Sequence, residues 1–211
     1  MSRDPLLLLG AGGHAKACID VIERQGRYEI AGLVGFAEEV GGSVLGYPVV
    51  GTAADFPDLL ARYARRILVT VGQIKTPDPR IRLFELAESH GCELPVIISP
   101  SAYVSPHAVI GAGTIVLHGA VVNAAAVVGR NCILNSCALV EHDVVIGDHC
   151  HIATAAIVNG GVKVGRGTFV GSNATVRQSV SVGGRCVIGM GQRVLDDCGE
   201  GAWLPPVRTT S

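Results

Sequence analysis

Residues 146–176 read IGDHCHIATAAIVNGGVKVGRGTFVGSNATV, and a Val or Ile stands at every sixth position of this segment. The spacing continues without a break from Ile98 to Val194, so that seventeen successive sixth positions hold Val, Ile or Leu. Chance gives such a run with odds on the order of one in a billion. A period of six matches neither the α-helix nor a simple alternating strand. This segment therefore decides the fold.

A period of six predicts a solenoid in which each hexad supplies one short strand and one corner. The aliphatic side chain points inward and stacks on its counterparts in neighbouring coils, which suits β-branched residues. Three hexads make a triangular coil of 18 residues, so the segment supplies five to six coils. Gly or Asn near a corner suits a positive φ angle. Seven of the aliphatic positions are followed directly by glycine: Gly111, Gly129, Gly147, Gly165, Gly171, Gly183 and Gly189.

The first 97 residues follow a different pattern, in which apolar runs alternate with helical periodicity. This alternation implies a small parallel sheet flanked by helices. We therefore predict an α/β domain at residues 1–97 and an all-β solenoid domain with a C-terminal tail at 98–211. The predicted elements of the first domain are a strand at Pro5–Leu9, a helix at about His14–Gln25, a strand near Ile30–Val34, a strand at Ile67–Val71 and a helix from about Asp78 or Arg80 to His90.

The turn after the first strand reads GAGGHA at residues 10–15, which formally matches the Rossmann fingerprint G-x-G-x-x-A. Backbone N–H groups at the start of the following helix could hold a phosphate group. A purely structural glycine turn is the alternative. NAD binding is not favoured, because Gly35 and Phe36 stand where the ribose-binding acid would be expected, and Glu38 comes late.

Composition excludes several classes of function. The 17 basic and 18 acidic residues give a net charge of −1, which offers no excess to neutralise nucleic acid or to coat an anionic membrane. The apolar run at residues 5–9 is too short for a signal segment or a membrane span. The seven cysteines are odd in number and contain no C-x-x-C pair, so we expect reduced core residues in a cytoplasmic protein.

Candidate chemistry gathers at residues 135–151. His142 stands between Glu141 and Asp143, and an imidazole flanked by carboxylates can act as a general base near neutral pH. Residues 18 apart lie one coil apart, about 4.8 Å. Gly160 should therefore lie directly above His142, where a bare backbone N–H could bind an oxyanion. Asn123, Glu141 and Asn159 should form a second column beside it.

Three segments together resemble one family: GAGGHA at 10–15, LNSCALVEHDVVIGDHCHIATAAIVNGGVKVG at 134–165, and the hexapeptide run. The family is the sugar acyltransferases of the PglD/NeuD type, which includes nucleotide-sugar N-acetyltransferases and sialic acid O-acetyltransferases. The resemblance implies a left-handed parallel β-helix behind a Rossmann-like domain that binds a nucleotide sugar. It also implies acetyl-coenzyme A as the acyl donor, no metal, and a homotrimer with sites at its subunit interfaces.

The resemblance further implies roles for individual residues. His142 would be the general base and Asp143 the acid that orients it, while the Gly160 amide would face the acetyl carbonyl during direct transfer without an acyl-enzyme. His151 and Arg193, with Gly160, would bind acetyl-coenzyme A. The residues implied to bind the nucleotide sugar are Gly10, Gly12, Gly13, His14, Gly72, Gln73 and Asn135.

The sequence departs from this family's pattern in four places. Relatives often carry paired aspartates after the second strand, whereas this chain has FAEE at 36–39. The loop at 71–80 is longer and more basic than usual. Arg177 and Gln178 replace a common Pro-Gly corner, and the tail at 203–208 reads WLPPVR. These departures fall on segments implied to meet the nucleotide and coenzyme A.

Several alternatives stay open at this point. The leading hypothesis is acetyl transfer to an amino group of a nucleotide-linked sugar, with the 4-amino group as the first choice. The main rival is O-acetylation of a sialic-acid-like sugar. A catalytically silent trimer that binds sugar nucleotides is a third. A zinc carbonic anhydrase is disfavoured, because His149 and His151 are two apart rather than five. We expect His149 to face solvent and Arg80 to be an ordinary solvated charge.

Overall fold

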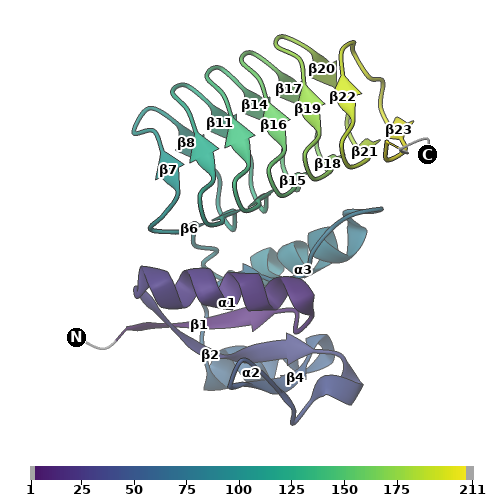
Figure 1. Ribbon diagram of the computed structural model, residues 1–211. Coiled ribbons are helices and arrows are strands. Elements are labelled where there is room, and N and C mark those ends of the chain that lie inside the picture. Colours follow the sequence, from purple (N-terminus) through teal and green to yellow (C-terminus); the bar gives the residue numbers. More distant parts are fainter. Residues whose placement is uncertain (1–2, 208–211) are drawn as a thin grey trace.

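The computed structural model describes residues 3–207. An α/β domain and a triangular prism of stacked coils lie one against the other (Figure 1). The sheet of the first domain has the strand order β3-β4-β2-β1-β5, parallel except for the short hairpin β3–β4. Its elements are β1 (Asp4–Leu9), α1 (Gly13–Gln25), β2 (Tyr28–Gly35), the 3₁₀ turn η1 (Ala37–Glu39), β3 (Ser43–Val44), β4 (Tyr47–Thr52), the 3₁₀ turn η2 (Ala53–Asp55), α2 (Phe56–Arg62), β5 (Ile67–Val69) and α3 (Asp78–Ser89).

All five elements predicted for this domain are present, but the two strands β3 and β4, the helix α2 and the 3₁₀ turns η1 and η2 were missed. The predicted third strand ends at Val69 rather than Val71. The missed hairpin contains Pro48 and Gly51 within β4, which disrupt a strand pattern. The missed helix α2 has seven residues, too few to show a helical period.

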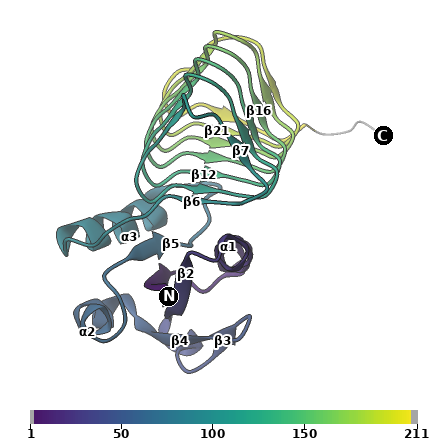
Figure 2. The same ribbon diagram turned by 90° about the vertical axis from the view of Figure 1, so that its left-hand side faces the viewer.

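The solenoid is a left-handed β-helix of two-residue strands that form three parallel sheets (Figure 2). From β6 to β19, each strand pairs with the one 18 residues further along, as Leu139 does with Ile157, whereas Val187 pairs with Trp203. The strands are β6 (Ile97–Ile98), β7 (Tyr103–Val104), β8 (Val109–Ile110), β9 (Ile115–Val116), β10 (Val121–Val122), β11 (Val127–Val128), β12 (Ile133–Leu134), β13 (Leu139–Val140), β14 (Val145–Ile146), β15 (His151–Ile152), β16 (Ile157–Val158), β17 (Lys163–Val164), β18 (Phe169–Val170), β19 (Thr175–Val176), β20 (Ser181–Val182), β21 (Val187–Ile188), β22 (Arg193–Val194) and β23 (Trp203–Leu204). Arg208, the end of the variant tail, lies outside the described residues.

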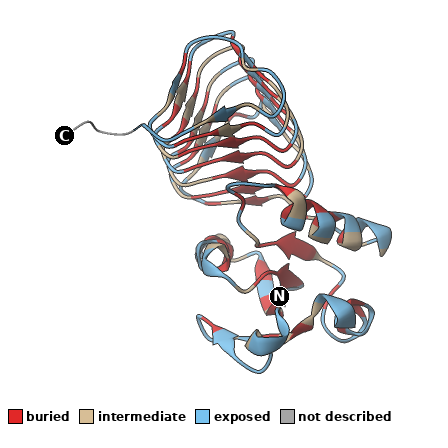
Figure 3. Cartoon of the chain, turned by 90° about the vertical axis from the view of Figure 1, so that its right-hand side faces the viewer, coloured by how far each residue is buried: buried red, intermediate tan, exposed pale blue. Residues whose placement is uncertain are grey.

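The aliphatic residue of each hexad fills the interior of the prism, as the period predicts. These side chains form one continuous core from Val116 to Val194, joined by small residues such as Ala138 and Cys150 at the corners. Figure 3 shows the buried residues running along the strands of the prism. Burial of aliphatic surface in this column is therefore the main source of stability for the second half of the chain.

Corner residues such as Gly161 and Asn131 have positive φ angles, as expected, but the glycines directly after the aliphatic positions serve a different purpose. The positive φ angles fall three residues after the aliphatic position, mostly at non-glycine residues such as Asp143 (φ 59°) and His149 (φ 59°). The glycine directly after the aliphatic residue is needed because adjacent coils touch there. A Cβ on Gly171 would lie 2.7 Å from the carbonyl oxygen of Ile188 in the next coil. Close stacking, rather than backbone handedness, selects these glycines.

The two domains share an apolar interface and a set of polar links. Side chains of β1 and α1 form one buried cluster with Ile97, Ile115, Leu117 and Ile133 of the solenoid. Beside it, Nε2 of His118 bonds Asp20 of α1 at 2.7 Å, while its Nδ1 accepts from Ser99 Oγ at 2.6 Å. The boundary between residues 97 and 98 stays a prediction. No helix among residues 3–207 is long and apolar enough to cross a membrane.

Replacing a stacking glycine should destabilise the prism. We expect Gly171→Ala to lower the free energy of unfolding by about 1–3 kcal/mol, because its new Cβ must push adjacent coils apart. Gly199→Ala is the matched control, since a Cβ there would meet no atom within 4 Å. Urea unfolding followed by circular dichroism measures both, and equal stability of the two variants would contradict the stacking explanation.

Candidate active site

His142 and Asp143 occupy the corner after β13, where the left-handed backbone of Asp143 turns its carboxylate toward the preceding ring. Nδ1 of His142 lies 2.8 Å from Oδ2 of Asp143. A carboxylate only accepts hydrogen bonds, so Nδ1 carries the proton and Nε2 is left with a free lone pair. The hydrogen bond to Asp143 raises the pKa of His142 above 6.5, against weak desolvation. Both side chains are about two-thirds exposed, at 64% and 67%, and so are accessible to a substrate.

Gly160 lies against this imidazole, as the 18-residue coil predicts. A Cβ built on Gly160 would stand 2.8 Å from both Cε1 and Nε2 of His142, so a side chain here would displace the ring. The neighbouring amide of Gly161 donates to the carbonyl oxygen of His142 at 3.0 Å, which fixes one coil on the other. Among residues 3–207, the N–H of Gly160 has no hydrogen-bond acceptor.

Glu141 is directed away from the ring, along its own column. Its Oε2 accepts from Nδ2 of Asn123 at 2.8 Å and, more weakly, from the backbone N–H of His142 at 3.4 Å. Asn159, in the next coil, donates its Nδ2 to the carbonyl of Val176. The predicted column of Asn123, Glu141 and Asn159 is therefore present, and it supports the backbone of the His142 corner.

Two adjoining hollows extend from this corner along the side of the prism. One, of about 500 Å³, is lined by Glu141, His142, Asp143, Asn159, Gly160, Gly161, Gln178 and Ser179. The other, of about 600 Å³, shares three of these residues and adds Thr175, Arg177, Arg193 and Leu195. Arg177 and Arg193 give its far end two cationic side chains, which suit an anionic ligand. The coenzyme A role of Arg193 stays a prediction.

His151 and Asn135 lie on a different part of the same chain. His151 points outward from β15, in the sheet that faces the N-terminal domain, and its Nδ1 donates to the carbonyl oxygen of Gln73 at 2.6 Å. Its Nε2 accepts from Nδ2 of Asn135 at 3.1 Å. Burial lowers the pKa of His151 to about 4, so the ring is neutral. Within one chain, this group is separate from the His142 corner.

Two expectations about polar residues in this region are wrong. Arg80 is fully buried rather than solvated, with 0% exposure, and its guanidinium donates to the carbonyls of Val69 (2.7 Å), Val71 (3.0 Å) and Asn131 (3.1 Å). Burial lowers its pKa to about 10. His149 is 2% exposed rather than solvent-facing, because α3 covers this face of the coil. Desolvation lowers its pKa to about 4.

A separate pocket of about 490 Å³ opens at the carboxyl ends of β1, β2 and β4, near the end of β5. Gly10 cannot carry a side chain, since its φ is 127° and a Cβ would lie 2.7 Å from Val71. Around Gly12 and Gly13, by contrast, a Cβ would meet nothing within 4 Å, which leaves the first amides of α1 open to a ligand. These three glycines line the pocket, together with His14 and Gly72.

The other two residues implied to bind the nucleotide sugar do not line this pocket. Gln73 is buried behind it and donates its Nε2 to the carbonyl of Gly167, while Asn135 belongs to the His151 group. His14 is held neutral, because burial and the nearby Arg80 lower its pKa to about 3. Among residues 3–207, no cluster of three or more His, Cys, Asp or Glu side chains could hold a metal ion.

The pKa of His142 should respond to its neighbour. We expect Asp143→Asn to lower the pKa of His142 toward 6.5, because the hydrogen bond to the carboxylate is the largest cause of its elevation. Glu141→Gln should shift that pKa less, since Glu141 is the weakest contributor. NMR titration of the His142 ring protons measures both, and a larger shift for Glu141→Gln would refute the assigned pairing.

Comparisons with known proteins agree with this architecture. Residues 5–84 match the model of the PglD N-terminal domain, and residues 143–178 match the bacterial transferase hexapeptide repeats. No curated protein matches the chain.

Solved structures match almost the whole chain. The acetyltransferase domain of PglB from Neisseria gonorrhoeae FA1090 is 32% identical, with 95% of this chain and 96% of that chain covered and a TM-score of 0.86. In complex with acetyl coenzyme A, the same domain gives 33% identity, 96% coverage of both chains and a TM-score of 0.85. A histidine-to-asparagine variant of perosamine N-acetyltransferase from Caulobacter crescentus, in complex with CoA and GDP-perosamine, is 33% identical. The match covers 96% of this chain and 93% of that chain, with a TM-score of 0.90. The chain belongs to the hexapeptide-repeat sugar acyltransferases with a PglD-type N-terminal domain, and it is an acyltransferase.

Proposed function

We propose that this protein transfers the acetyl group of acetyl-coenzyme A directly to the amino group of a nucleotide-linked sugar. The observation that carries the proposal is the His142 ring, oriented by Asp143 at 2.8 Å and packed on Gly160 with its Nε2 free. Two matched structures support the proposal: the acetyltransferase domain of PglB is in complex with acetyl coenzyme A, and the perosamine N-acetyltransferase is in complex with CoA and GDP-perosamine.

His142 acts as the general base in the proposed reaction. The sugar amine attacks the thioester carbonyl while its proton passes to Nε2 of His142, and Asp143 stabilises the resulting imidazolium. Negative charge develops on the carbonyl oxygen, where the N–H of Gly160 can donate. The tetrahedral intermediate collapses, the carbon–sulfur bond breaks, and the thiolate of coenzyme A takes the proton from His142. No acyl-enzyme forms.

The amine is the favoured acceptor because two matched structures from Caulobacter crescentus, at 33% and 34% identity, are named a perosamine N-acetyltransferase and PerB, and both contain CoA and GDP-perosamine. The 4-amino position is part of the proposal, and amino sugars substituted at other positions test it. The same base could also deprotonate a hydroxyl group. An assay that offers matched amino and hydroxyl sugars therefore distinguishes N-acetylation from O-acetylation.

For the acyl donor, the hollow lined by Arg177 and Arg193 supplies cationic side chains for the phosphates of coenzyme A.

Loss of the base should abolish most of the activity. We expect His142→Ala to lower the rate of coenzyme A release with UDP- or GDP-linked 4-amino sugars by about 10²–10⁴-fold. His107→Gln, an exposed corner histidine of an earlier coil, is the matched control and should leave the rate unchanged. Undiminished turnover by His142→Ala would remove it from the mechanism, and a wild-type protein that turns over no such acceptor would refute the proposed function.

We also propose that the active unit is a homotrimer with sites between subunits. The His142 corner and the Asn135–His151 group lie apart within one chain, so a second copy is needed to bring them together. One sheet of the prism also exposes a stripe of valines, Val109, Val127 and Val145, at 59%, 42% and 44%. An apolar stripe on a flat sheet suits burial against a second copy.

Mixed trimers test where the site lies. We expect His142→Ala and Asn135→Ala to be weakly active alone, and their reassembled mixture to recover about a quarter of wild-type activity, because one interface in four then holds both intact residues. Refolding each variant alone is the control. A mixture no more active than its parents, or a fully active monomer in sedimentation, would contradict an interface site.

A further inference from the structure

The pocket of the N-terminal domain has a carboxylate inside it and an aromatic ring at its opening. Phe36, directly after β2, is 72% exposed although its side chain is apolar. The surrounding wall contains Ala53, Ala54 and Leu83, so this end of the pocket is apolar on both sides. An exposed aromatic side chain next to an apolar pocket is typical of a site that receives a flat ring.

Glu39 is brought back to the end of β2 by the 3₁₀ turn η1. Its Oε2 accepts from the backbone N–H of Phe36 at 2.8 Å, and the backbone N–H of Glu39 returns to the carbonyl of Phe36 at 3.0 Å. A Cβ on Gly35 would stand 2.6 Å from that Oε2 and 3.2 Å from the Cβ of Ala11. The carboxylate thus lies between β2 and the glycine turn, although Glu39 stands four residues beyond Gly35 in the sequence.

The order of groups along the pocket matches the order of groups in a nucleotide. The open amides at Gly12 and Gly13 favour phosphate, because they begin α1 and no acidic residue stands in its first turn. Glu39 would repel phosphate, but it accepts hydrogen bonds from hydroxyl groups. It lies next to Ala11, one residue before those amides, and Phe36, which directly follows Gly35, also lines the pocket.

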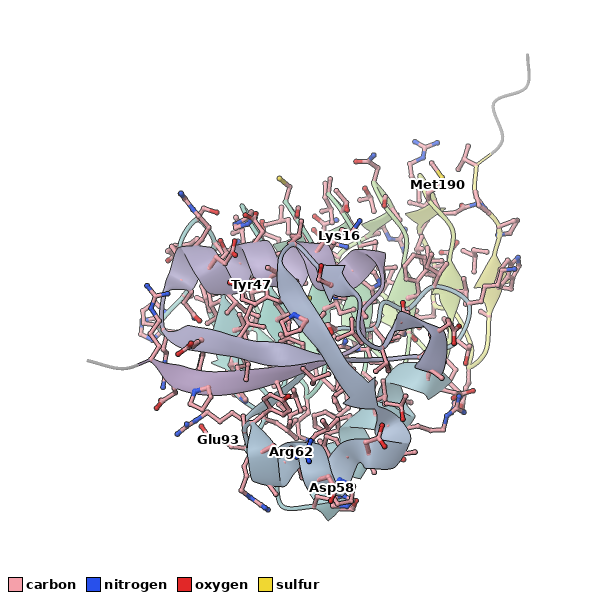
Figure 4. The ribbon with its side chains drawn as sticks, turned by 90° about the horizontal axis from the view of Figure 1, so that it is seen from below. Lys16, Tyr47, Asp58, Arg62, Glu93 and Met190 are labelled. Carbon is pink, nitrogen blue, oxygen red and sulfur yellow. The ribbon has the colours of Figure 1, made fainter. Side chains whose placement is uncertain are left out.

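We infer that Glu39 binds the ribose hydroxyls of the nucleotide and that Phe36 stacks on its base. This inference rests on the proposed function, because it concerns the nucleotide of the same sugar substrate. It makes Glu39 the residue that distinguishes ribonucleotides from their deoxy counterparts. Neighbouring Glu38 does not line this pocket. It lines an adjacent hollow, together with Glu39 and with Lys16 of α1, which is labelled in the view from below (Figure 4).

Calorimetry with GDP, UDP and their 2′,3′-dideoxy analogues tests the role of Glu39. Of GDP and UDP, we take the one that wild-type protein binds more tightly. We expect its affinity to exceed that of its dideoxy analogue by about tenfold or more, since a charged acceptor makes a strong hydrogen bond. Glu39→Gln should reduce that ratio about tenfold. The amide oxygen can still accept from Phe36, so the turn is kept. Removing the negative charge of Glu39 would also strengthen binding of the ribonucleotide and of its dideoxy analogue by the same factor. The ratio of the two affinities, rather than either affinity alone, therefore reports the hydrogen bond to the ribose hydroxyls.

Glu38→Gln is the matched control for charge and position, and its ratio should equal that of wild-type protein. Nucleotide binding without a preference for ribose, or a Glu39→Gln ratio equal to wild type, would overturn the inference and leave the proposed function standing. Absence of binding by either ribonucleotide to wild-type protein would overturn both.

Phe36 should give the opposite signature. We expect Phe36→Ala to weaken the ribonucleotide and its dideoxy analogue equally, by about tenfold, because base stacking does not depend on the sugar hydroxyls. The ratio between them should stay at its wild-type value. Unchanged affinity for both ligands would overturn the stacking role, and a changed ratio would show that Phe36 acts through Glu39 instead.

Discussion

In-register contact between successive 18-residue coils is the constraint on which the rest of this protein depends. Each two-residue strand is too short to be stable alone, and it gains its hydrogen bonds and its buried aliphatic surface only from the coils before and after it. The same register sets His142 beneath Gly160. A slip of one residue would turn every inward side chain outward, so the packing of the core also fixes the geometry of the candidate site.

The sequence could predict those features that the repeat determines. Strand positions, coil length, the His142–Gly160 contact and the column through Glu141 all follow from a constant period, because residues related by translation must stack. The N-terminal strands and helices followed from apolar runs and a glycine turn. Hairpin β3–β4 and helix α2 could not be found this way, since Pro48, Gly51 and a seven-residue length leave no period to detect.

Contacts between the two domains were beyond a one-dimensional pattern. Arg80 and His149 look like surface residues within their own segments, but both are buried where α3 meets the prism. Glu39 shows the same limit at shorter range. In the sequence, Glu39 stands four residues after Gly35, the last residue of β2, so it would not be expected to lie at the end of that strand. The 3₁₀ turn η1 brings its carboxylate back to Gly35. The repeat glycines were found correctly, but steric contact between coils explains them and φ does not.

Arg80 has a mechanical consequence. A buried guanidinium that binds carbonyls at the end of β5 and in the prism holds the two domains at one angle, and His118 and His151 add further links across the same boundary. Separating the domains would break the hydrogen bond from Arg80 to the carbonyl of Asn131, although the acceptors at Val69 and Val71 lie in its own domain. The pocket of the N-terminal domain is therefore held at a fixed distance from the prism of its own chain. If the proposed sites are both occupied by one acceptor, its length matters as well as its chemical groups. Only a molecule long enough to place its amino group at the base while its nucleotide fills the pocket would then react.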